Sequence, residues 1–148
     1  MEKFTKIIFA DFDGTCLGPM AEAIMNHKTS NCIEVTSRGI VVLFSEPCNP
    51  KVYSVLRNHN IPFAESSTRP FKNKDFNFST VVLVPTFKDK KNTYADYDDA
   101  INVYTIKEFV GLEGDIEVPF GQSEVAYEAL YKELDELLSM VIKKINII

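Results

Sequence analysis

The residues best suited to chemistry in this 148-residue chain lie between positions 11 and 18. Asp11 and Asp13 are separated by one residue, and Gly14, Thr15 and Cys16 follow them. Two carboxylates this close in a tight loop could converge on one hard cation such as Mg²⁺. An Asp-Gly pair is more often a simple turn than a site, and Cys16 is expected to be a small buried hydrophobe.

The sequence on either side of this loop predicts how it is held. The apolar run 7–10 predicts a buried strand that ends at Asp11, and Pro19 is suited to the first position of a helix. A strand, a tight loop and a helix start cradle phosphate with backbone N–H groups. The alternative is a loop satisfied internally, in which Asp11 or Asp13 accepts the N–H bonds that a phosphate would have taken.

The remaining chain alternates strands and helices, which predicts an α/β three-layer sandwich with a central four-stranded parallel sheet and helices on both faces. We expect one domain over residues 1–148. The apolar runs and helical spacings place strands at 33–37, 80–84 and 101–104, and helices at 20–28, 50–60, 86–94 and 123–145, with a helical turn at 105–110 and a loop at 111–121.

The composition argues against two classes of partner. The formal net charge is −5, whereas a nucleic-acid or anionic-membrane partner would call for a basic patch. We therefore expect no nucleic acid and no membrane among the partners. Three cysteines without metal-ligand spacing and no sign of a signal peptide predict free thiols and a cytoplasmic protein.

Motifs along nearly the whole chain resemble the low-molecular-weight protein tyrosine phosphatases, and their bacterial branch in particular. The loop spacing followed by Pro-Met-Ala-Glu-Ala at 19–23 is similar to that family's signature. The resemblance continues in Glu34-Val35-Thr36-Ser37-Arg38-Gly39, Ser66-Ser67-Thr68-Arg69, Val103-Tyr104-Thr105-Ile106-Lys107-Glu108-Phe109-Val110, Gly114-Asp115-Ile116 and Pro119-Phe120-Gly121.

This resemblance implies a role for two segments of the chain. It places the family's nucleophilic cysteine at Asp11, its phosphate-binding arginine at Leu17, a serine at Gly18 and its general-acid aspartate at Val118. The phosphate-loop equivalent is Asp11, Phe12, Asp13, Gly14, Thr15, Cys16, Leu17 and Gly18, and the general-acid-loop equivalent is Val118, Pro119 and Phe120.

These placements predict that the nucleophilic cysteine, the arginine and the general acid are all absent. We therefore expect no catalytic residue, no metal and no cofactor, and a protein that works by binding an unknown protein or small anion. Whether it is an enzyme stays open at this stage, as does its oligomeric state.

A second resemblance implies different chemistry. Residues 9–15 are similar to the first motif of haloacid-dehalogenase-type phosphatases, an apolar strand followed by Asp-x-Asp-Gly-Thr. It implies a divergent phosphatase with Asp11 as nucleophile, Asp13 as acid and base, and Mg²⁺ between them. This resemblance covers one motif, and the acidic pair Asp98-Asp99 precedes its strand, which places it at the opposite edge of the sheet.

Overall fold

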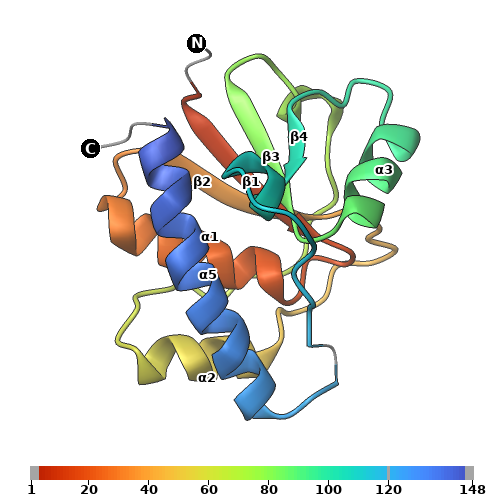
Figure 1. Cartoon of the computed structure of the whole chain (residues 1–148). Coiled ribbons are helices and arrows are strands. Elements are labelled where there is room, and N and C mark those ends of the chain that lie inside the picture. The colour runs from red at the N-terminus through yellow and green to blue at the C-terminus, as the bar shows by residue number, and fades with distance from the viewer. Residues whose placement is uncertain (1–3, 120, 146–148) are drawn as a thin grey trace.

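The computed structural model describes residues 4–119 and 121–145 and shows the predicted parallel sheet with helices on both faces (Figure 1). Within these residues the strand order is β2-β1-β3-β4. No helix in the described ranges is long and apolar enough to cross a membrane. The elements are β1 (Lys6–Asp11), α1 (Leu17–Thr29), β2 (Glu34–Gly39), α2 (Pro50–Asn58), η1 (Asn73–Asp75), β3 (Thr80–Val84), α3 (Phe87–Asp96), β4 (Val103–Thr105), α4 (Ile106–Phe109) and α5 (Glu124–Ile145).

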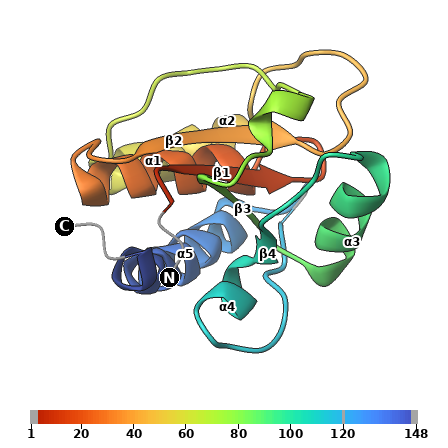
Figure 2. The same cartoon turned by 90° about the horizontal axis from the view of Figure 1, so that it is seen from above.

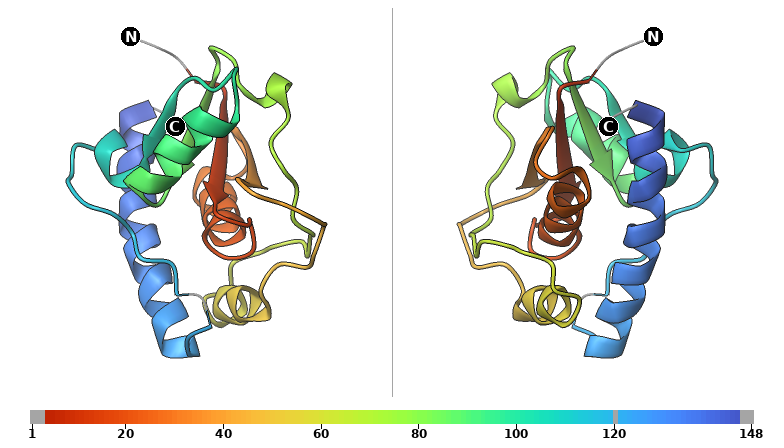
Figure 3. Two further views of the ribbon diagram at one scale, coloured as in Figure 1. Left: turned by 90° about the vertical axis from the view of Figure 1, so that its right-hand side faces the viewer. Right: turned by 90° about the vertical axis from the view of Figure 1, so that its left-hand side faces the viewer.

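Side chains of β1 alternate between two hydrophobic cores. Ile7 and Phe9 pack with residues of α1, α2 and α5, whereas Ile8 and Ala10 pack with Phe71 on the other face. In the side views, α5 lies on one side of the sheet and the long segment between α2 and β3 lies on the other (Figure 3). The view from above shows the four strands edge to edge, with β1 between β2 and β3 (Figure 2). Burial on both faces explains the unbroken apolar runs.

Several element boundaries differ from the prediction by one to three residues, and two of the differences have a clear structural reason. Helix α1 begins at Leu17 and not at Met20, so Pro19 is its third residue. The earlier start is possible because a carboxylate accepts the first N–H groups of the helix. Strand β4 begins at Val103 and not at residue 101, because Asn102 has a left-handed backbone with φ 56°.

The β1–α1 loop, defined here as residues 11–18, lies at the carboxyl edge of the sheet. Its backbone packs closely on the end of β2, and a Cβ on Gly14 would lie 2.9 Å from the backbone nitrogen of Gly39. Gly14 also has φ 81°, a conformation that favours glycine. The backbone N–H groups of Ile40 and Val41 then donate to the carbonyl oxygens of residues 11 and 12. These contacts fix the loop against the segment that follows β2.

Candidate functional site

The carboxylate of Asp11 occupies the N-terminus of α1. Its Oδ2 atom accepts hydrogen bonds from the backbone N–H groups of Cys16 at 3.2 Å, Leu17 at 2.6 Å and Gly18 at 3.3 Å. These N–H groups have no partner within the helix, and together with the helix dipole they attract an anion. The structure therefore shows an internally satisfied loop, with Asp11 as the acceptor.

Asp11 holds this position at an electrostatic cost. Its side chain is fully buried, and its second oxygen, Oδ1, has no hydrogen-bond partner among the described residues. Burial, and next the negative charge of Asp13, raise the pKa of the carboxyl from 3.8 to about 6, although the three N–H bonds act in the opposite direction. The group is thus mostly ionised at pH 7, but it is poised to take up a proton in mildly acidic solution.

Asp13 has a separate, local role. Its Oδ1 accepts hydrogen bonds from the backbone N–H of Thr15 at 3.0 Å and from the hydroxyl of Thr15 at 2.7 Å. This pairing closes a tight turn around Gly14, of the kind that aspartate favours. Asp11 and Asp13 therefore each serve different N–H groups and do not share a common ligand within the loop.

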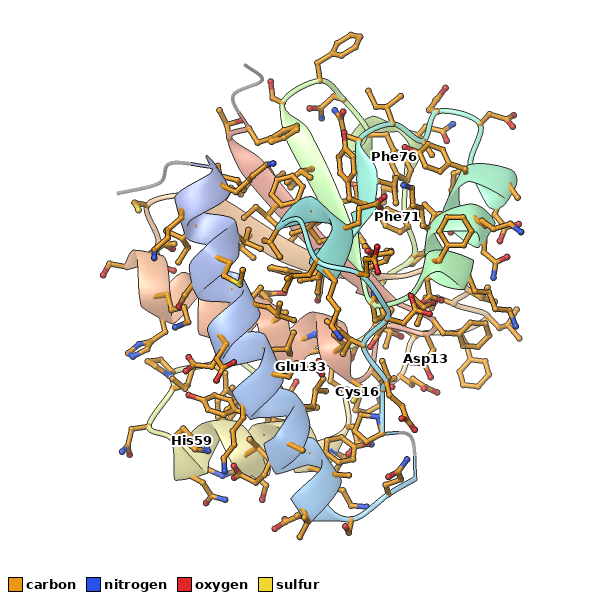
Figure 4. The ribbon with its side chains drawn as sticks, viewed as in Figure 1. Asp13, Cys16, His59, Phe71, Phe76 and Glu133 are labelled. Atoms are coloured by element: carbon orange, nitrogen blue, oxygen red, sulfur yellow. The ribbon has the colours of Figure 1, made fainter. Side chains whose placement is uncertain are left out.

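Cys16 lies inside the loop, directly before α1, where its thiol is buried. Burial and the charge of Asp11 raise the pKa of the thiol to about 12. Figure 4 shows Cys16 and Asp13 near each other at the end of the sheet where α1 begins. At neutral pH the group is a thiol and not a thiolate, and the thiolate is the nucleophilic form.

The two residues after Cys16 serve packing. Leu17 is fully buried in the core between the sheet and α5. Gly18 lies against the sheet, where an added Cβ would come within 3.2 Å of the Ser37 side chain and 3.3 Å of the Phe9 carbonyl. The start of α1 is therefore fixed tightly on β1 and β2.

The segment predicted to correspond to the general-acid loop comes close to the β1–α1 loop. Val118 and Glu117 line a hollow of about 450 Å³ together with Phe12 and Lys88. Pro119 is buried, and Phe120 lies outside the described residues. The fold thus brings residues 117 and 118 to the same edge of the sheet as residue 12.

Sequence reasoning missed two groups of residues near the loop. Tyr127 of α5 is fully buried, and its hydroxyl accepts a hydrogen bond of 3.0 Å from the side chain of Asn49. Its helical spacing predicts a core residue and does not reveal this polar contact. The apolar residues 41–44 were also missed, because an apolar run normally predicts a buried strand, whereas Leu43 and Phe44 are exposed.

Comparisons with known proteins point to one family of phosphatases. The sequence model described as "Low molecular weight phosphotyrosine protein phosphatase" matches residues 6–147. The low molecular weight protein-tyrosine-phosphatase PtpB of Staphylococcus haemolyticus is 30% identical over 129 residues, covering 87% of this chain and 91% of that protein. The protein-arginine-phosphatase of Geobacillus stearothermophilus is 30% identical over 143 residues, covering 95% and 96%.

Solved structures agree. The low molecular weight protein tyrosine phosphatase from T. tengcongensis superposes with a TM-score of 0.86 at 30% identity, covering 94% of this chain and 98% of that one. The YwlE arginine phosphatase from Geobacillus stearothermophilus gives a TM-score of 0.86 at 28% identity, covering 95% and 92%. A parallel sheet with an anion-accepting loop at a helix start is typical of α/β proteins that bind phosphate. The chain belongs to the low molecular weight phosphotyrosine protein phosphatase family.

The expectation that this chain lacks a nucleophilic cysteine is wrong. Cys16 lies buried within the loop, its backbone N–H bonds to Asp11 beside that of Gly18, and relatives that match almost the whole chain are phosphatases by name. The comparison by position assigned the nucleophile to position 11 and treated Cys16 only as a small buried hydrophobe. A thiol is present in the loop, so its chemistry has to be judged from its surroundings.

Proposed function

We propose that this protein is a member of the family that binds a partner and does not hydrolyse phosphate esters by cysteine chemistry. The observation that carries the proposal is the carboxylate of Asp11 on the N–H groups of Cys16, Leu17 and Gly18. Those are the groups that a substrate phosphate would need at the N-terminus of α1. The protein supplies the anion itself, so the loop is closed by its own side chain.

The energetics support a closed loop. An ionised Asp11 about 4 Å from a phosphate oxygen would repel it by roughly 4 kcal/mol at an effective dielectric constant of about 20. Residues 11–18 contain no lysine or arginine to offset this repulsion. A phosphate would also have to displace Asp11 from three hydrogen bonds, one of them only 2.6 Å long.

The state of Cys16 supports the same proposal. A cysteine attacks phosphate as a thiolate, which neighbouring cations or helix N-termini stabilise by lowering the pKa. Here burial and the adjacent charge of Asp11 raise the pKa of Cys16 to about 12. The helix N-terminus that could lower it is already engaged with the Asp11 carboxylate.

The second candidate function is a divergent phosphatase, which the names of the relatives and the thiol of Cys16 favour. The Mg²⁺ version, with Asp11 as nucleophile and Asp13 as acid and base, fits the geometry poorly. Both carboxylates already accept N–H groups of the loop, and Asp11 is fully buried. Among the described residues, no group of three or more His, Cys, Asp or Glu side chains is placed to hold a metal.

The test is hydrolysis of p-nitrophenyl phosphate, a phosphotyrosine peptide and a phosphoarginine peptide by purified protein, in EDTA and in millimolar Mg²⁺. We expect no turnover under either condition. Turnover in EDTA that disappears in Cys16→Ser would establish cysteine chemistry and refute the proposal. Turnover that requires Mg²⁺ and disappears in Asp11→Asn would establish the metal-dependent alternative.

A binding experiment tests the closed loop directly. In Asp11→Ala the three N–H groups lose their acceptor, so tungstate should bind and raise the melting temperature, whereas the parent protein should show no stabilisation at the same micromolar concentration. Asp11→Ser serves as a second variant in case the alanine protein folds poorly. Equal stabilisation of parent and variants by tungstate would show that Asp11 does not block the site. The single domain, the cytoplasmic location and the identity of the partner remain predictions.

A further inference from the structure

Four large apolar side chains are exposed beside the β1–α1 loop. Phe12 is 52% exposed, Val41 37%, Leu43 88% and Phe44 71%. We call these four residues the apolar rim, and they line one small hollow together. Single exposed hydrophobic residues are ordinary, but a contiguous group of them marks an interaction site. The rim lies at the carboxyl edge of the sheet because residue 12 follows β1 and residues 41–44 follow β2.

The hollow inside the rim carries negative charge. Asp13 and Glu46 line it together with Thr68, and no lysine, arginine or histidine of the described residues does so. Asp13 uses its Oδ1 atom for Thr15, so its Oδ2 atom remains available. The carboxylate of Glu46 has no hydrogen-bond or ion-pair partner among the described residues, although its backbone is held by Thr68. The hollow is therefore complementary to a cation.

The size of the hollow restricts its occupant. Its volume is about 210 Å³, below the roughly 300–1,000 Å³ typical of small-molecule pockets. A single long side chain suits it better. Lysine and arginine pack an aliphatic stem on apolar walls and place the charged head at a polar end, and arginine also stacks on aromatic rings and pairs with carboxylates through two N–H groups.

We propose that the hollow binds a basic side chain of a partner protein, with apolar neighbours of that side chain packed on the apolar rim. This inference rests on the proposed binding function and names the chemistry of its partner. The favoured partner is an exposed segment in which arginine or lysine stands between large apolar residues. The carboxylates disfavour an acidic or phosphorylated segment at this place, and the net charge of −5 acts in the same direction.

The probe is a fluorescein-labelled heptapeptide with a central Phe-Arg-Leu, compared with versions that carry glutamate, citrulline or lysine in place of arginine. Fluorescence anisotropy should show saturable binding of the arginine and lysine peptides. We expect about tenfold weaker binding of the glutamate peptide, and an affinity for the arginine peptide that falls as salt is raised. Citrulline keeps the shape of the arginine side chain and removes its charge. The citrulline peptide should therefore bind about as weakly as the glutamate peptide, or slightly more tightly.

Matched variants locate the surface. Phe44→Ser should weaken binding of the arginine peptide about tenfold. Phe78→Ser is the control and should have no effect, because Phe78 is an 84% exposed phenylalanine just before β3, at the opposite edge of the sheet. Glu46→Gln should weaken binding of the arginine peptide several-fold and leave binding of the citrulline peptide unchanged. Glu113→Gln is the acidic control, because Glu113 is exposed and does not line the hollow.

Three results would overturn this inference: no saturable binding of the arginine peptide up to millimolar concentration, equal affinity for the arginine and glutamate peptides, or equal effects of Phe44→Ser and Phe78→Ser. Dimerisation in light scattering that disappears in Phe44→Ser would instead assign the surface to a second copy of the chain. Phosphatase turnover would refute the proposed function and leave a positive peptide result standing, so the two failures are distinguishable.

Discussion

Replacing Asp11 by asparagine tests the electrostatic cost of the closed loop. The pKa of this carboxyl is raised from 3.8 to about 6 in the fold. A raised pKa means that the folded protein binds the proton more tightly than the unfolded chain does, so ionisation opposes folding. The rise corresponds to about 3 kcal/mol over the whole titration. About 1.4 kcal/mol of this loss falls between pH 5 and pH 8, because the folded-state pKa lies inside that window.

The measurement is the free energy of unfolding from urea denaturation of the parent and of Asp11→Asn at pH 5, 6, 7 and 8. Asparagine keeps an oxygen for the N–H of Leu17 and removes the charge. The free energy of unfolding of the parent, taken relative to that of Asp11→Asn, should therefore fall by about 1.4 kcal/mol from pH 5 to pH 8. Using the change with pH cancels any constant cost of burying the extra amide hydrogens.

Asp99→Asn is the control, since Asp99 is exposed and replaces a carboxylate in the same way. The change at Asp11 is read against this control, measured over the same pH range. The reasoning about Asp11 would be refuted if the parent gained stability over Asp11→Asn as the pH rises. That result would mean that the three N–H bonds outweigh burial and the charge of Asp13, and that the carboxylate is a net stabilising anion.

Three further outcomes follow from the structure. In a thiol titration of the native protein with an aromatic disulfide, the exposed Cys32 should react rapidly. Cys16 should react only after unfolding, because its thiol is buried and has a pKa of about 12. Rapid reaction of Cys16 in the native protein would contradict the closed loop. Tyr127→Phe removes the acceptor of the Asn49 amide and should lower the free energy of unfolding by about 1 kcal/mol in urea denaturation. Asp75→Asn breaks the ion pair with Arg38 and should lower the free energy of unfolding by about 3 kcal/mol at pH 7, measured in the same way. Because the pKa of Asp75 is lowered in the fold, this difference should shrink as the pH falls through that pKa.

The fold could be predicted because its signals are local. Apolar runs end at polar turn residues, and the leucine-rich spacing of α5 needs no knowledge of its partners to predict a helix. The motifs at 19–23 and 103–110 then fixed the family. The start of α1 was predicted wrongly because it depends on the direction of the Asp11 side chain, which reaches the first N–H groups of the helix.

The candidate site could be located from the sequence but not interpreted from it. The residues of the loop and the alternative of an internal acceptor were predicted, yet sequence spacing cannot say which carboxylate points inward. The structure decides this point: the loop pairs with residues 40 and 41 and packs on Gly39, which leaves Asp11 at the end of a buried strand and Asp13 in a surface turn.

The error about the cysteine has the same origin. Matching single positions predicts which residue replaces another, but the chemistry of a thiol depends on its burial and on the charges around it, which belong to the folded chain. The sequence by itself determined the sheet, its helices and a phosphate-type loop, because these follow from periodicity and turn chemistry along the chain. Only the folded structure decided that Asp11 and not Asp13 takes the place of an anion, and that its charge lies beside the Cys16 thiol and raises the pKa of that thiol. It alone also places the exposed apolar rim beside the carboxylates of Asp13 and Glu46, because residues 12–13 and 41–46 come from separate segments that meet at one edge of the sheet.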